Sequence, residues 1–109
     1  MRMMLTRELQ TIQRRSAPVF RRYGIRKASV FGSVARGDSR KRSDVDILVD
    51  VPRGMDLFEF SGLRIDLQDA LKKKVDLVTF RSLHHLMRDA VLEEQKIIYS
   101  KSSLSAMAR

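Results

Sequence analysis

The sequence predicts a small α/β domain of the α+β kind, in which helices pack on one face of a mixed β-sheet. Three observations lead to this prediction: helical periodicity in the long stretches, strand periodicity in the short apolar stretches between them, and the size of the chain. A chain of 109 residues with 43% hydrophobic residues buries well over half of the surface that it exposes when unfolded. We therefore expect one domain over residues 1–101 and a flexible C-terminal tail over residues 102–109.

The helices are predicted from apolar residues that recur at steps of three to four. A first helix is expected over residues 5–22, with an apolar face made of Leu5, Leu9, Ile12, Ser16, Val19, Phe20 and Tyr23. Gly24 follows at a position where helices commonly end. A second helix is expected over residues 57–71, with an apolar face made of Leu57, Phe58, Phe60, Leu63, Leu67, Ala70 and Leu71. A third helix is expected over residues 83–94.

The strands are predicted outside these helices, where apolar residues form short runs or alternate with polar residues. Residues 28–31 form a first strand that ends at a Gly-Ser pair, and a short helical turn follows through residue 36. Residues 37–43 are polar and are expected to form a loop. Apolar and mostly acidic residues then alternate up to residue 51, which is the period of a strand with one apolar face. Two further strands are expected at residues 75–79 and 97–99.

The amino-acid composition excludes some classes of protein and of metal site. No apolar run approaches the eighteen or more residues that span a bilayer, and no export signal is visible, so a soluble cytoplasmic protein is expected. The absence of cysteine excludes disulfides and thiolate metal sites. The net charge of +9 comes from residues 1–42, which hold twelve Lys and Arg against two acids. This charge favours a polyanionic partner or simply a solvated helix face, and charge alone does not choose between them.

Two acidic residues on one predicted strand are the first candidates for a site. Asp44 and Asp46 are two residues apart, so their side chains point to the same side of the strand while Val45 faces the core. Hard divalent cations such as Mg²⁺ prefer carboxylate and phosphate oxygens. Asp76, on a separate predicted strand, completes the site if that strand lies beside the first. Three carboxylates can hold two cations, one at the attacking oxygen and one at a leaving pyrophosphate.

Gly32 and Ser33 are the second half of the candidate site. A glycine lets a phosphate approach the backbone closely, and a strand-to-helix turn directs free N–H groups at it. The Ser33 hydroxyl adds a donor. Arg36, one helical turn later, either neutralises phosphate charge or pairs with Asp38 or Asp44.

These motifs resemble a known family. The segments FGSVARGD (residues 31–38), SDVDILV (43–49), VDLV (75–78) and IIY (97–99) are similar to the minimal nucleotidyltransferase family of the polymerase-beta-like superfamily. The resemblance implies the nucleotidyltransferase fold, with Gly32 and Ser33 as the phosphate-binding pair. It also implies that Asp44 and Asp46 bind metal and that Asp76 is the third carboxylate.

The resemblance also implies an activity and a partner. The expected reaction is Mg²⁺-dependent transfer of AMP from ATP to an acceptor hydroxyl, with release of pyrophosphate. Free-standing members of the family are often antitoxins of a small all-helical HEPN ribonuclease, the toxin, which they modify on tyrosine. Larger relatives hold the acceptor in a second domain that this sequence lacks, so we expect the acceptor site to come from a partner or a second copy.

Other interpretations stay open at this point. The acidic pair could protect an exposed strand edge against pairing with another chain. The protein could be an antitoxin that acts by binding alone, which the retained Asp76 argues against, or a nucleotidyltransferase acting on an aminoglycoside-like molecule. Nucleic-acid binding is less favoured than a protein partner, and the sequence does not determine the nucleotide base or the oligomeric state. No role in the site is predicted for Asp50 or Asp56.

Overall fold

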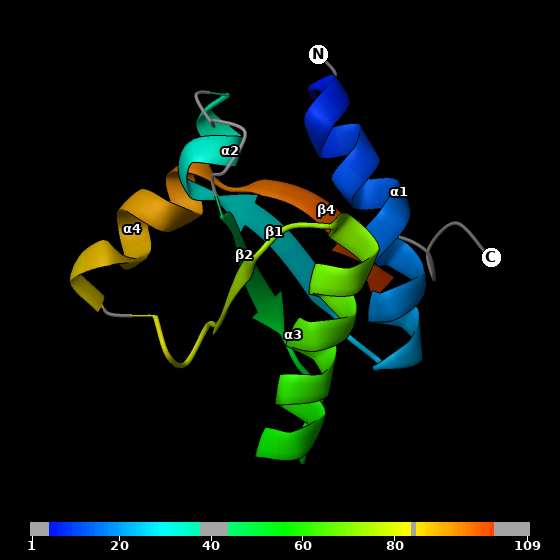
Figure 1. The fold of residues 1–109 in the computed structure, drawn as a ribbon. Helices are drawn as coiled ribbons and strands as arrows, with labels where there is room; N and C mark the ends of the chain where they lie inside the picture. Colours follow the sequence, from blue (N-terminus) through cyan, green and yellow to red (C-terminus); the bar gives the residue numbers. More distant parts are fainter. Residues whose placement is uncertain (1–4, 38–43, 84, 102–109) are drawn as a thin grey trace, which may run out of the picture.

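The computed structural model describes residues 5–37, 44–83 and 85–101, which form four helices and four strands (Figure 1). Along the chain these are α1 (Arg7–Arg22), β1 (Lys27–Phe31), α2 (Gly32–Arg36), β2 (Val45–Asp50), α3 (Leu57–Leu71), β3 (Val75–Thr79), α4 (His85–Glu94) and β4 (Lys96–Ser100). Every predicted helix and strand is present, with ends shifted by one or two residues. The predicted tail at 102–109 and most of the predicted loop at 37–43 lie outside the described residues.

The four strands form one mixed sheet in the order β3-β2-β1-β4. β1 pairs antiparallel with both β2 and β4, whereas β2 and β3 run parallel. The prediction of a mixed sheet is therefore confirmed. The parallel pair matters most for the site, because β2 carries Asp46, β3 carries Asp76, and Asp44 immediately precedes β2.

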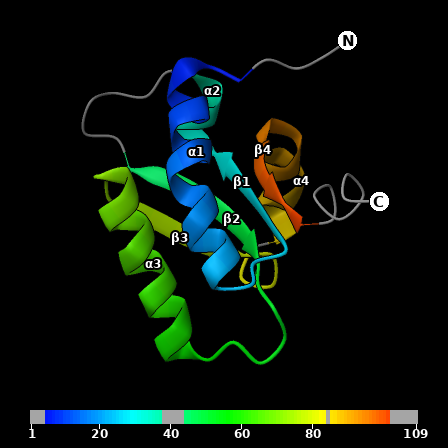
Figure 2. The ribbon, with the colours of Figure 1, turned by 90° about the vertical axis from the view of Figure 1, so that its right-hand side faces the viewer.

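Helices α1 and α3 cover one face of the sheet and enclose the main core, and Figure 2 shows them side by side in front of the strands. The prediction that helices pack on one face holds for these two but is wrong for α4. Val91 of α4 packs with Leu48 and Leu83 in a second, smaller core. Leu48 points away from the main core, because it alternates with Ile47 and Val49 on β2, and α4 shields it from water.

The ends of α1 follow from local sequence. The Thr6 hydroxyl accepts a hydrogen bond from the Leu9 N–H (3.2 Å), which caps the first turn. Gly24 has a φ of +69°, and the N–H of Ile25 donates to the Phe20 carbonyl (3.0 Å). This arrangement is a Schellman motif, so the predicted role of Gly24 is confirmed.

Helix α3 begins with a capping box in which Asp56 and Glu59 each accept a hydrogen bond from the other's backbone N–H. Asp56 thus has a structural role that the sequence analysis missed. The predicted apolar face was wrong for the first turn, where Leu57 is 78% and Phe58 90% exposed. The start of α3 extends past the end of the sheet in Figures 1 and 2, so these side chains have no strand to pack against. Leu63, Leu67 and Leu71 of α3 are buried in the core, and Phe60 and Ala70 pack against it.

Within the described residues, none of the helices combines the length and the apolar character that crossing a membrane requires.

Candidate active site

The three predicted carboxylates lie on neighbouring strands. Asp46 of β2 stands directly opposite Asp76 of β3 in the parallel register. Asp44 immediately precedes β2, two residues before Asp46, and therefore points to the same side. Val45, between them, is fully buried in the main core. The prediction that β3 lies beside β2 and brings Asp76 to the acidic pair is confirmed, whereas the chemical roles of the three residues stay predictions.

The electrostatics of this group are unusual for carboxylates. The pKa of Asp46 is raised from about 3.8 to about 6, first because burial disfavours its charge and then because Asp76 and Asp44 are negative neighbours. A hydrogen bond with Asp76 raises the pKa further, and only Arg36 lowers it. Asp46 therefore holds a proton at mildly acidic pH.

Gly32 packs against this pair from the end of β1. Its φ is +74°, a conformation that residues with a Cβ adopt only with strain. A Cβ at this position would also overlap the carboxylate of Asp46 and lie 3.2 Å from its Cγ. The register explains the contact, because Phe31, the residue before Gly32, pairs with Asp46. Glycine is thus required both by the backbone and by the approach of Asp46.

Glu94 is a member of the site that the sequence analysis did not find. The Gly32 N–H, which we expected to be free for a phosphate, donates to Glu94 Oε1 (2.9 Å). Arg36 Nη1 lies 3.4 Å from Glu94 Oε2, so Arg36 has an ion-pair partner that neither predicted role included. Asp38, one of its predicted partners, lies outside the described residues. Because these contacts join residues 58 and 62 positions apart, no local motif signals them.

The donor set fits a hard divalent cation by charge and chemistry. Three carboxylates gather where one arginine compensates only part of their charge, and Mg²⁺ prefers carboxylate oxygens. Within residues 5–37, 44–83 and 85–101, however, no three acidic or histidine side chains are arranged to hold a metal ion as they stand. Asp46 and Asp76 share a hydrogen bond instead. Metal binding would therefore require loss of the Asp46 proton.

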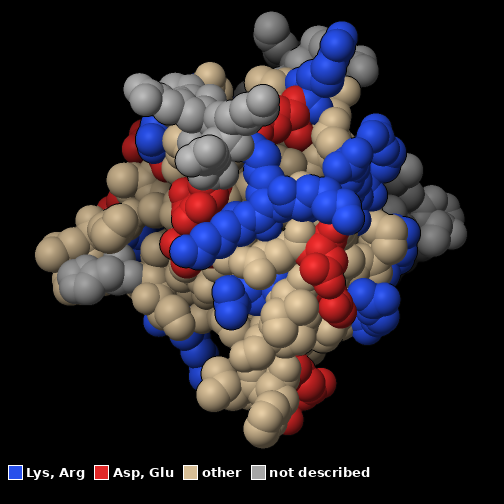
Figure 3. Space-filling view, viewed as in Figure 1, with Lys and Arg blue, Asp and Glu red and all other residues tan. Residues whose placement is uncertain are grey.

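Basic side chains surround the acidic group. Lys72 and Lys74 are exposed and lie in the segment that leads from α3 into β3, just before Asp76. Lys73 between them pairs with Glu8 of α1 (3.2 Å). Figure 3 shows Lys and Arg side chains in a band across one face of the molecule, beside patches of acidic side chains. An acidic group beside a basic band can hold a cation and attract a phosphorylated ligand at the same time.

A comparison with protein families identifies the same region. The family model described as "Polymerase beta, Nucleotidyltransferase" matches residues 15–104. The match includes Gly32, the three carboxylates and Glu94.

Known proteins with similar sequences and structures agree with this match. The chain is 42% identical to "Protein adenylyltransferase MntA" of Thermococcus cleftensis over 73 residues, which cover 67% of this chain and 74% of that protein. A solved structure of a "putative minimal nucleotidyltransferase" has a TM-score of 0.71 at 37% identity, covering 81% of this chain and 93% of that one. A crystal structure of a toxin–antitoxin with AMP-PNP also has a TM-score of 0.71, covering 87% of this chain and 78% of that one. Its identity of 24% makes this a likeness of fold.

Proposed function

The chain belongs to the polymerase beta nucleotidyltransferase family, and from this membership we propose that it transfers AMP from ATP to a hydroxyl group of a partner protein. The observation that carries the proposal is the acidic group next to Gly32. Asp46 faces Asp76 across the parallel strands, and the pKa of Asp46 is raised to about 6 by burial and by its acidic neighbours. Carboxylates that repel one another are unfavourable for the metal-free fold, so their association indicates a site for a cation and its triphosphate.

Each residue of the site has a proposed role. Asp44, Asp46 and Asp76 would hold Mg²⁺, since three carboxylates can serve two ions, and bound metal would supply positive charge near the attacking oxygen and the leaving pyrophosphate. Ser33 donates its hydroxyl to a phosphate oxygen, and Arg36 neutralises phosphate charge. The Gly32 N–H contributes once Glu94 has released it.

The proposed transfer is a single displacement at phosphorus. The acceptor oxygen bonds to the α-phosphorus of ATP while the bond from that phosphorus to the oxygen bridging to the β-phosphate breaks, and pyrophosphate leaves. The proton of the acceptor hydroxyl goes to a carboxylate. Asp76 suits this role, because it is the more exposed member of the Asp46–Asp76 pair. Positioning and charge stabilisation provide most of the catalysis in reactions of this kind.

A protein is the acceptor that the comparisons support best. The relative from Thermococcus cleftensis is named a protein adenylyltransferase, and one protein of the same fold was crystallised as a toxin–antitoxin with an ATP analogue. These names support a toxin as the partner, whereas the HEPN class of that toxin and a tyrosine as the modified residue are what the family resemblance implies. The chain then acts as the antitoxin of the pair.

Label transfer tests the proposal. The purified chain is incubated with Mg²⁺, the protein encoded beside it, and ATP labelled at either the α- or the γ-phosphate. We expect label from the α-position alone to reach the partner, and we expect EDTA or Asp46→Asn to prevent the transfer. Transfer of the γ-label would identify a kinase instead. Absence of any transfer from a mixture that still forms a complex would contradict the proposal and favour an antitoxin that acts by binding alone.

A further inference from the structure

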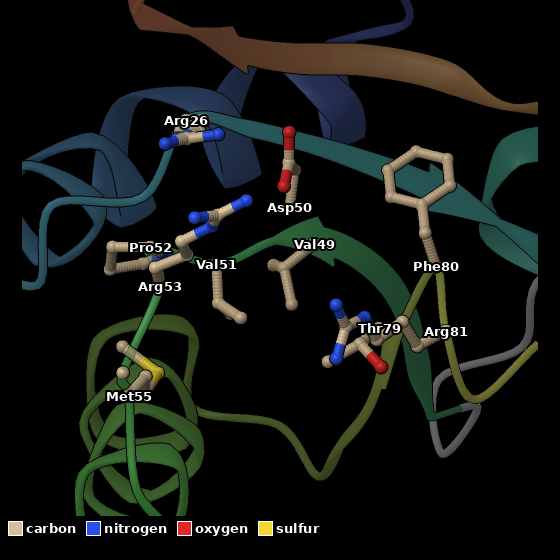
Figure 4. Close-up of a pocket in the computed structure, with 11 residues that line it drawn as sticks. Arg26, Val49, Asp50, Val51, Pro52, Arg53, Met55, Thr79, Phe80 and Arg81 are labelled. Carbon is tan, nitrogen blue, oxygen red and sulfur yellow. The ribbon is translucent and has the colours of Figure 1, made fainter.

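A polar cavity lies at the end of β2 and β3 that is opposite to the carboxylates. Its volume is about 420 Å³, and its charged lining consists of Arg26, Asp50, Arg53 and Arg81 (Figure 4). The three arginines come from three separate connections: one before β1, one after β2 and one after β3. Phe80 also contributes to the wall.

The geometry of β2 separates this cavity from the candidate active site. Asp46, Leu48 and Asp50 point to the same side of the strand, with Asp46 at its start and Asp50 at its end. Four residues of extended strand span roughly 13 Å. Leu48, between the two acids, is fully buried beneath α4. The cavity is therefore a distinct site rather than an extension of the carboxylate group.

The cavity has an excess of positive charge, which Asp50 compensates only in part. The side chains of Arg26, Arg53 and Arg81 are exposed, and within the part of the chain that the structure describes none of them forms an ion pair. Asp50 is the single acidic residue among those that line the cavity. Figure 4 shows the guanidinium groups of Arg26 and Arg53 on the side of Asp50, and that of Arg81 across the cavity beside Thr79.

We propose that this cavity binds the phosphate group of a phosphorylated molecule. A guanidinium group donates paired N–H groups to the oxygens of a phosphate or a carboxylate. One arginine is enough for the two oxygens of a carboxylate. A phosphate can accept from several arginines at once, so three arginines favour a phosphate. Three positive charges against one negative charge also suit a dianion. A volume of about 420 Å³ lies in the range of small-molecule sites, and Val51, Pro52 and Met55 add apolar lining for the rest of the ligand.

This site does not depend on the proposed transferase activity, since it uses none of the residues assigned to nucleotide transfer. The phosphate could be a monoester of a small molecule or a diester of a nucleic-acid strand. Both offer anionic phosphate oxygens, three on a monoester and two on a diester, and experiment distinguishes them.

Titration of the full-length chain, observed by two-dimensional amide NMR in the absence of Mg²⁺, tests the proposal. The probes are inorganic phosphate, AMP and a short oligonucleotide with hydroxyl ends. We expect the amides of Arg53, Gly54 and Arg81 to shift at millimolar probe, and those of Ser33 and Asp46 to report separately on any binding at the carboxylates. A preference for AMP identifies a monoester ligand, and a preference for the oligonucleotide identifies a nucleic-acid strand.

Substitution of the arginines gives the matched control. Arg53→Gln and Arg81→Gln should each weaken binding roughly tenfold, because each removes a charge-assisted hydrogen-bonding group. Arg64→Gln, an exposed arginine of α3 outside the cavity, should leave binding unchanged. Thermal melting confirms that each variant is folded. The proposal is overturned if none of the probes shifts the amides around the cavity, if the three variants weaken binding equally, or if a glutamate-rich peptide binds there more tightly than any phosphate probe.

Discussion

Asp46 of β2 and Asp76 of β3 face each other across the one parallel strand pair of the sheet, and the pKa of Asp46 is raised to about 6. Burial is the largest cause, and the charges of Asp76 and Asp44 follow. A fold selected only for stability gains nothing from this arrangement. The repulsion between these carboxylates is explained if a bound cation offsets it when the protein is active.

The first prediction concerns the pH dependence of stability in the metal-free protein. The folded state raises the pKa of Asp46 above its ordinary value near 3.8, so its contribution to stability is fully present below that value and is lost as pH rises through about 6. At pH 8 in EDTA, Asp46→Asn should therefore be more stable than wild type, by on the order of 2 kcal/mol. Melting temperatures measured from pH 4.5 to 8 check this. If the melting temperatures of wild type and Asp46→Asn changed with pH in the same way, the charge of Asp46 would not destabilise the fold.

The second prediction is that the carboxylates are required for transfer and not for folding. Asp44→Asn and Asp76→Asn each remove a metal-binding charge, and each should lower the transfer rate by about 10³-fold or more while the fold is kept. Asp69→Asn changes an exposed acid of α3 and serves as the control. Single-turnover rates at saturating Mg²⁺, with circular dichroism of each variant, make the measurement. Near-wild-type rates in either carboxylate variant would remove that residue from the site.

The third prediction compares two glycines with similar backbones. Gly32 and Gly37 have φ values of +74° and +79°, so alanine adds similar backbone strain at both. At Gly32 the new Cβ overlaps Asp46, whereas at Gly37 it meets no atom of the described residues within 4 Å. Gly32→Ala should abolish ATP binding in calorimetry, while Gly37→Ala should bind nearly as wild type does. Equal affinities in the two variants would mean that the approach of Gly32 to Asp46 has no part in binding.

Ser33 should matter less than either Gly32 or the carboxylates. As a single neutral donor to phosphate, its hydroxyl is worth roughly 1–3 kcal/mol of transition-state binding. We expect Ser33→Ala to lower kcat/KM by the corresponding factor and to leave the melting temperature unchanged. A variant with full kcat/KM would show that the Ser33 hydroxyl does not contact the nucleotide.

The fifth prediction concerns Glu94, which holds the Gly32 N–H at 2.9 Å and pairs with Arg36. Glu94→Gln keeps an oxygen that can accept from Gly32 but removes the negative charge that repels a phosphate. ATP should therefore bind several-fold more tightly with little change in stability, whereas Glu93→Gln on the exposed neighbour should have no effect. Weaker ATP binding that parallels a loss of stability would show that Glu94 only supports the turn.

The sequence was sufficient for those features that depend on local patterns. Alternation along residues 44–51 and the apolar run around Asp76 predicted both strands, and their adjacency then brought the carboxylates together. Glu94 could not be predicted in this way, because its contacts with Gly32 and Arg36 depend on where α4 ends in three dimensions.

Burial was also hard to predict where it depends on the extent of the sheet. Leu57 and Phe58 fit the period of an apolar helix face, yet the first turn of α3 extends beyond the strands. Leu48 was expected on the acidic side of β2, but nothing in its neighbourhood indicated that α4 would cover it. The arginine-lined cavity likewise joins three arginines from distant connections, which have no common motif.

Mass spectrometry of the partner protein is the most direct test of whether this chain transfers AMP to it. The chain is co-expressed with the protein encoded beside it, as wild type and as Asp44→Asn, and the intact mass of the purified partner is measured. We predict that the partner gains one or more AMP units on hydroxyl side chains when it is co-expressed with the wild-type chain. It should gain none when it is co-expressed with Asp44→Asn. A partner that stays unmodified and is neutralised equally well by both proteins would contradict the proposed AMP transfer.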